Sequence, residues 1–148
     1  MRVMRFAGTS RILAVVVFIA ALLTVILPAG TARAEAYQYW GYYTLSNGQW
    51  QYAQTGPDQT NPTDGSVEGW RFAVASQDDA RPPRGTVTFS AVCGSTKAVD
   101  GKKRVAVVID YGRKADATGA TPKKPMASCA QVPAAATGAD VLAAVSTV

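Results

Sequence analysis

Side chains able to carry out chemistry are few in this chain, and histidine is absent from all 148 residues. Without an imidazole base, the sequence excludes a Ser-His-Asp triad and any histidine-containing metal site. The two cysteines, Cys93 and Cys129, are an even pair, which favours a disulfide over a reactive thiol. We interpret them as one structural bridge that closes a loop of about 37 residues and stabilises the fold by roughly 3.8 kcal/mol.

Carboxylates are the remaining candidate catalytic groups, since a pair of them can hydrolyse glycosidic bonds. Most stand among turn-forming residues, where an aspartate typically caps its own backbone. Three oxygen ligands, Asp58, Asn61 and Asp64, lack the alternating spacing of a calcium loop. Glycine motifs that bind phosphate are absent as well. The sequence therefore predicts a protein that is not an enzyme, with no catalytic residues, no cofactor and no metal.

Aromatic side chains form the most distinctive group. Eleven follow residue 35, and nine of these lie between residues 37 and 72. Asn47-Gly48 separates two aromatic runs, and both of its positions tolerate the positive φ of a tight turn. We therefore predict a hairpin with strands at 37–45 and 49–54, in which Leu45 lies opposite Trp50.

Side-chain alternation along this hairpin separates two aromatic sets. One set has the character of a core surface: Tyr37, Tyr39, Tyr43, Leu45, Trp50 and Tyr52. Trp40 and Tyr42 project from the opposite face, where either a helix or loop covers them or they contact a ligand. Arg71, on a strand predicted at 67–75, can join them by stacking on a ring or pairing with an anionic ligand group. The candidate ligand-binding residues are Trp40, Tyr42 and Arg71.

Other segments complete an α+β fold with an antiparallel-rich sheet, a C-terminal helix and one disulfide. The β-branched run within 104–111 predicts a central strand buried on both faces. A short helix is predicted from Thr88, although its sequence also suits a strand, and an edge strand is predicted at 128–132. Thr137 and Asp140 form a variant capping box that predicts a final helix.

The first 34 residues have the composition of a secretory signal peptide. Sixteen residues from Ile12 to Leu27 are apolar apart from Thr24, and Ala32-Arg33-Ala34 is a small-x-small cleavage motif. An uncleaved anchor is the alternative, but the run is shorter than the roughly 20 residues that span a bilayer. We expect one exported domain at residues 35–148, secreted after cleavage.

Charge argues against nucleic acid as a partner. The four arginines of the first 34 residues account for most of the formal charge of +5, and eleven basic and ten acidic residues remain after cleavage. A polyanion binder needs basic residues clustered in its folded domain. The runs at 102–104 and 123–124 lie beside turn residues and are interpreted as solvated loops.

Several motifs resemble the transcobalamin-like C-terminal domain, a β-grasp-like module that covers bound cobalamin. They are Tyr39-Trp40-Gly41-Tyr42-Tyr43, Asn47-Gly48, Gly56, Asp64 to Phe72, and the helix Thr137 to Ala144. The resemblance implies a small-molecule vitamin, cobalamin or another corrinoid, as ligand. The helix motif follows the aromatic motif here, whereas it precedes that motif in the family.

Beyond residue 34 the chain also resembles small exported actinobacterial proteins of unassigned function that are associated with energy-coupling-factor uptake systems. This resemblance implies a membrane transporter component as a partner. Together the two resemblances suggest a ligand-binding module beside a vitamin or cobalt uptake transporter. The alternatives are a protein that contacts cell-wall carbohydrate, because exposed aromatic rings also stack on sugars, and a purely structural extracellular protein.

Overall fold

A computed structural model describes residues 36–76, 79–117 and 119–146, so the predicted signal peptide lies outside the described residues. The elements, in chain order, are β1 (Tyr37–Ser46), β2 (Gln49–Tyr52), β3 (Val67–Ala75), α2 (Phe89–Cys93), β4 (Lys102–Asp110), η2 (Lys114–Asp116), β5 (Met126–Pro133) and α3 (Gly138–Val145). Within those ranges, no helix has the length and apolar character needed to cross a membrane.

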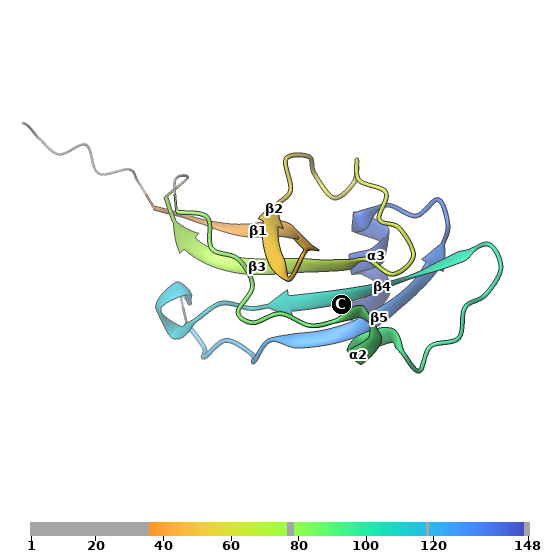
Figure 1. Cartoon of the computed structure of the whole chain (residues 1–148). Coiled ribbons are helices and arrows are strands. Elements are labelled where there is room, and N and C mark those ends of the chain that lie inside the picture. The colour runs from red at the N-terminus through yellow and green to blue at the C-terminus, as the bar shows by residue number, and fades with distance from the viewer. Residues whose placement is uncertain (1–35, 77–78, 118, 147–148) are drawn as a thin grey trace, which may run out of the picture. The chain divides into compact units, whose positions relative to one another are not determined.

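The five strands form one sheet in the order β2-β1-β3-β4-β5, shown in Figure 1. This confirms the predicted α+β class with a C-terminal helix. The sheet is mixed, however, because β3 and β4 run parallel while the other three pairings are antiparallel. A parallel pair needs a long crossover, and here the connection that contains α2 returns the chain to the starting end of β3.

The first hairpin has the predicted register, with Leu45 opposite Trp50 and Tyr43 opposite Tyr52. Its turn residues Asn47 and Gly48 have φ values of 51° and 76°. Two positive φ angles in succession match the twist of the strands. Tyr52 is nevertheless half exposed, because β2 is an edge strand of the sheet and ends at this residue.

Strands β3 and β4 form the buried middle of the sheet. Val105 to Ile109 of β4 are buried on both faces, as the β-branched run predicts, although β3 rather than β4 holds the central position in the strand order. Strand β5 is an edge strand that ends at Pro133, which confirms the prediction for 128–132. Proline removes the backbone donor needed to continue the ladder.

A helix packs on each face of the sheet (Figure 1). The first face buries Tyr42, Trp70 and Val107 with Val141 of α3. Thr137 and Asp140 close the capping box at the start of α3, as predicted. The second face buries Val67 and Ala106 with Cys93 of α2.

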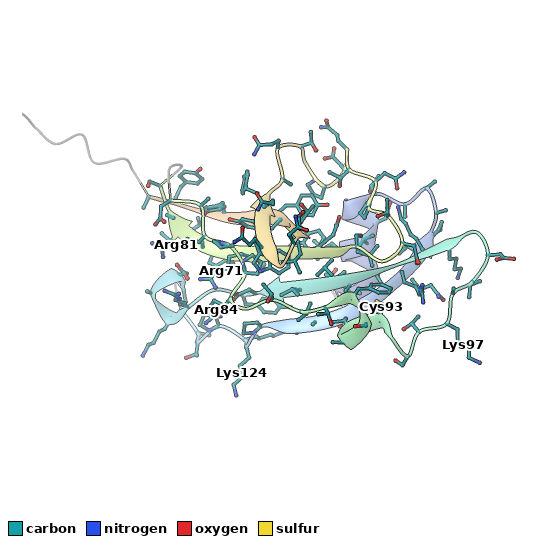
Figure 2. The ribbon with its side chains drawn as sticks, viewed as in Figure 1. Arg71, Arg81, Arg84, Cys93, Lys97 and Lys124 are labelled. Carbon is teal, nitrogen blue, oxygen red and sulfur yellow. A yellow bond between two sulfur atoms is a disulfide. The ribbon has the colours of Figure 1, made fainter. Side chains whose placement is uncertain are left out.

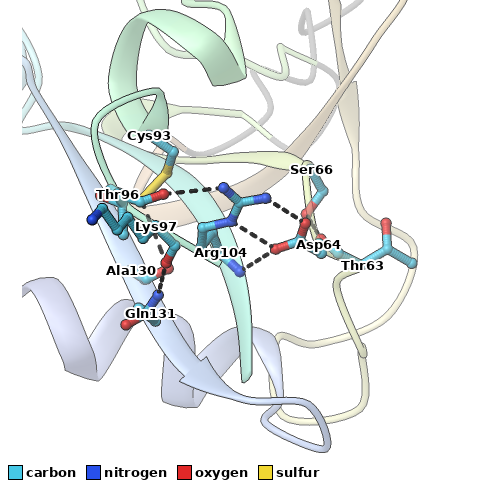
Figure 3. The surroundings of a disulfide bond; sticks show 10 residues. Thr63, Asp64, Ser66, Cys93, Thr96, Lys97, Arg104, Ala130 and Gln131 are labelled. Carbon is cyan, nitrogen blue, oxygen red and sulfur yellow. Dashed lines mark hydrogen bonds and ion pairs between the residues drawn. A yellow bond between two sulfur atoms is a disulfide. The ribbon is translucent and has the colours of Figure 1, made fainter. Parts of the chain in front are cut away.

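The predicted disulfide joins Cys93 at the end of α2 to Cys129 of β5. Figure 3 shows that Arg104 lies beside it and connects two further segments. The Arg104 guanidinium donates to the Asp64 carboxylate and to the carbonyl of Thr96, and this pairing lowers the pKa of Asp64 to about 2. The disulfide region is therefore tied to the loop that precedes β3.

Candidate functional site

Trp40 and Tyr42 lie on the same face of the sheet as α3. Strand β1 pairs with β3 so that Trp40 is opposite Phe72 and Tyr42 is opposite Trp70. The Tyr42 and Trp70 rings are 4.9 Å apart, and the Trp40 ring lies 5.6 Å from Phe72 and 5.9 Å from Tyr111. The alternation of β1 thus gathers aromatic rings from β1, β3 and the end of β4.

These rings border an apolar pocket of about 410 Å³ beside the last turn of α3, which we name the Trp40 pocket. Its lining includes Trp40, Tyr42, Trp70, Ile109, Tyr111 and Leu142. A volume of this size is typical of a small-molecule site, in which apolar surface supplies most of the contact.

The two predicted residues differ in burial. The Trp40 side chain is 49% exposed, whereas Tyr42 is 6% exposed. A Cβ added to Gly138 at the start of α3 would approach the Tyr42 hydroxyl to 2.7 Å. The C-terminal helix therefore packs closely over the Tyr42 hydroxyl, which is the covering that the sequence left open for this residue. Trp40 stays half exposed at the mouth of the pocket.

A buried polar network lies beneath Tyr42. Its hydroxyl is 3.0 Å from Thr60 Oγ1, and burial raises the pKa of the phenol well above its usual value. Glu68 on β3 is also buried, and its Oε2 has no hydrogen-bond partner among the described residues. Burial raises the pKa of Glu68 to about 7, although the Tyr42 hydroxyl and the charge of Lys103 oppose the shift.

Lys103 is the buried cation of this network. Its ammonium group donates to Asn61 Oδ1 and to the carbonyl of Ala136, and burial lowers its pKa despite the nearby Glu68 charge. It therefore joins the loop before β3 to the start of the α3 region. Within this network, Tyr42 alone lines the Trp40 pocket. The rest of the lining is aromatic and aliphatic apart from the hydroxyls of Tyr111 and Ser146.

Arg71 does not share a face with Trp40 and Tyr42, so this part of the predicted site is corrected. It lies opposite Gly41 in the β1–β3 ladder, which turns its side chain to the second face. There it is buried, with Nη1 at 2.5 Å from Asp110 Oδ2 and Nη2 at 3.2 Å from Asp116 Oδ2. A strand alternates its faces, so a residue between Trp70 and Phe72 cannot join the rings that pair with them.

Six further pocket residues were not predicted as site residues: Pro57, Trp70, Ile109, Tyr111, Leu142 and Ser146. The β3 alternation together with the β1–β3 register would have found Trp70. Tyr111 and Leu142 come from elements distant in sequence, so no local signal identifies them.

In the part of the chain that the structure covers, no group of three or more His, Cys, Asp or Glu side chains could hold a metal ion, and both cysteines form the disulfide.

A family model described as the SCO2322-like domain matches residues 32–148, and the chain therefore belongs to that family. No curated protein and no solved structure matches the chain. The family description names neither a ligand nor a transport system.

Proposed function

We propose that this member of the SCO2322-like family is an exported, non-enzymatic module that binds a small ligand through a flat, largely apolar group in the Trp40 pocket. The observation that carries the proposal is the half-exposed Trp40 ring at the mouth of an apolar pocket of about 410 Å³. Exposed tryptophan is costly to leave in water and favourable to cover with a second flat surface.

The walls of the pocket explain why a flat group would fit. Tyr42 and Trp70 are buried rings held in place by the sheet and by α3, so they form a rigid surface. Trp40 contacts the rings of Phe72 and Tyr111 and is half exposed. A ligand entering the pocket would contact rigid rings inside and cover Trp40 at the rim, which keeps the entropic cost of binding low.

Export and the absence of catalysis are also part of the proposal. A disulfide persists in an oxidising compartment, and the Cys93–Cys129 bridge supports that location. The described lining of the pocket has no carboxylate, amine or thiol that could act on a bound molecule, and its hydroxyl groups are those of Tyr42, Tyr111 and Ser146. Binding alone is the activity for which its residues are suited.

A corrinoid such as cobalamin is the first ligand we propose to test, with a membrane uptake component as the partner that would receive it. The motifs that resemble the transcobalamin-like domain fall in β1, in the β1–β2 turn, in the loop after β2, in β3 and in α3. Strands β1 and β3 supply Trp40, Tyr42 and Trp70 to the pocket. A whole corrinoid is larger than the pocket. It would lie across Trp40 with one edge inserted.

Carbohydrate is the second candidate, because a hollow of about 450 Å³ adjoins the first pocket and shares Trp40 and Tyr111 with it. Lys123 lies over the Tyr111 ring at 5.6 Å and adds a polar donor to this hollow. A sugar ring stacked on Trp40 would place its hydroxyl groups near that donor.

Tryptophan fluorescence distinguishes these functions. The chain is titrated with cobalamin, with cobinamide and with soluble cell-wall glycans, and a saturable change is expected with a corrinoid. Trp40→Phe should weaken the response, whereas Trp50→Phe should not, because Trp50 lies on the other face with its indole donating to the Gly85 carbonyl. A glycan response would favour the second candidate, and no response to any probe would contradict ligand binding and indicate a structural protein.

A further inference from the structure

A pocket of about 430 Å³ on the second face of the sheet is lined by guanidinium groups. Its residues include Arg71, Arg81, Arg84 and Arg113, which come from β3, from the segment after β3 and from the residue that precedes η2. We name it the arginine pocket. Figure 2 shows Arg71, Arg81 and Arg84 close to one another at the end of the sheet where β3 and β4 finish.

Buried carboxylates hold these arginines in position. Asp110, at the end of β4, is fully buried and accepts from Nε and Nη2 of Arg84 as well as from Nη1 of Arg71. Burial alone would raise the pKa of Asp110, but the hydrogen bonds from Arg84 and Arg71 outweigh it and hold that pKa well below its usual value. Asp110 is therefore a permanent anion that orients two guanidinium groups before any ligand arrives.

Asp116, in η2, also helps to hold Arg71 in position. It accepts from Nη2 of Arg71 and from the backbone N–H groups of Arg113 and Val74. The two buried aspartates thus hold two of the arginines that line the pocket, Arg71 and Arg84, in position. Because these side chains are already ordered, binding of an anion would carry a smaller entropic cost.

The pocket retains unused donors and an excess of positive charge among the described residues. Its four arginines face three aspartates, Asp79, Asp110 and Asp116. The buried Nε–H of Arg71 has no acceptor in the described part of the chain. An unmade hydrogen bond on a buried charged group is costly, so this position favours an additional acceptor.

We propose that the arginine pocket binds an oxyanion, the phosphate or carboxylate group of a small ligand. Arginine is the side chain best suited to such groups because its planar donors match their oxygens. The internal ion pairs explain how the segment after β3 is held to the sheet, but they leave one positive charge and the Arg71 Nε–H uncompensated. An oxyanion would compensate both.

This site is independent of the Trp40 pocket, because the β1–β3 register puts Arg71 and Trp40 on opposite faces of the sheet. Failure of corrinoid or glycan binding would therefore leave the oxyanion site unaffected, and the reverse also holds.

The test is NMR titration of the purified chain with inorganic phosphate and, separately, with acetate, at constant ionic strength set by chloride. The arginine Nε–H signals are followed, and the buried Nε–H of Arg71 is expected to shift saturably. A response to phosphate alone would identify a tetrahedral group as the ligand, and a response to acetate alone a carboxylate.

Two matched variants test the assignment. Arg113→Gln removes a pocket charge from an exposed position and should weaken binding of the responding anion roughly tenfold. Lys114→Gln removes the same charge from the adjacent exposed residue, which does not line the pocket, and should weaken it less than about twofold. Absence of saturation with both anions, or equal effects of the two variants, would overturn the proposal.

Discussion

Trp40 and Trp70 are the same residue type on the same face of the sheet, but their surroundings give them different roles. Trp70 is 3% exposed and belongs to the cluster that α3 covers, whereas Trp40 is 49% exposed at the pocket mouth. A buried tryptophan contributes through the apolar area it removes from water and the cavity its loss would leave. A half-exposed one contributes much less to folding and remains available to a partner.

Alanine substitution at these two positions should therefore separate stability from binding. We expect Trp70→Ala to lower the free energy of unfolding by about 3 to 5 kcal/mol and Trp40→Ala to lower it by about 1 kcal/mol, which is the scale of its edge contacts with neighbouring rings. Urea denaturation measures both values. Equal losses would show that Trp40 is a core residue and would contradict its assignment to a binding site.

Glu68 is the buried residue whose ionisation most affects stability near neutral pH. Its pKa is raised from 4.5 to about 7 in the folded chain, so the folded state holds a proton that the unfolded state has released. Stability must then fall as the pH rises from about 4.5 to about 7, and remain lower above that range. The aspartates do not interfere in this window, because those with shifted pKa values, such as Asp110 and Asp116, have them lowered.

Glu68→Gln should remove this pH dependence. A shift of this size corresponds to about 3 kcal/mol, so the variant should gain up to that amount relative to the wild type at pH 8 and little at pH 4.5. Urea denaturation at a series of pH values between these limits gives the comparison. A wild-type stability that stays constant or rises across the range would show that Glu68 is ionised in the fold with an ordinary pKa.

At the scale of elements, the sequence predicts well what depends on neighbouring residues. The hairpin register follows from Asn47-Gly48, and the start of α3 follows from Thr137 and Asp140. In each case the turn or cap is formed by side chains and φ angles within four residues. The bounds of β3, 67–75, also match their prediction because its alternation of large and small residues is local.

Pairings between elements that are distant in the sequence could not be predicted from neighbouring residues. The parallel β3–β4 pair depends on a crossover, and the β1–β3 register decides which face Arg71 occupies. Alternation within β1 was enough to predict that Trp40 and Tyr42 share a face of the sheet. Tyr111 and Leu142 could not be placed in the pocket in this way, since only the packing of β4 and α3 brings them there.

On the scale of the whole domain, the sheet separates two kinds of surface. The α3 face holds the apolar Trp40 pocket, and the α2 face holds the arginine pocket together with the disulfide. The two helices are short, five and eight residues, and such helices depend on packing rather than on their own propensity. The disulfide is therefore the strongest constraint that keeps α2 on its face.

Reduction of the disulfide should lower the stability of the domain. Cys93 and Cys129 are 36 positions apart, and closing a loop of that length restricts the unfolded chain by about 4 kcal/mol, a large share of the 5 to 15 kcal/mol typical of a domain. Urea denaturation with and without reductant should show a loss of about 3 to 4 kcal/mol. Intact mass of the protein purified without reductant should be two hydrogens below the thiol form. Two free thiols, or an unchanged unfolding free energy after confirmed reduction, would contradict the structural role of the bridge.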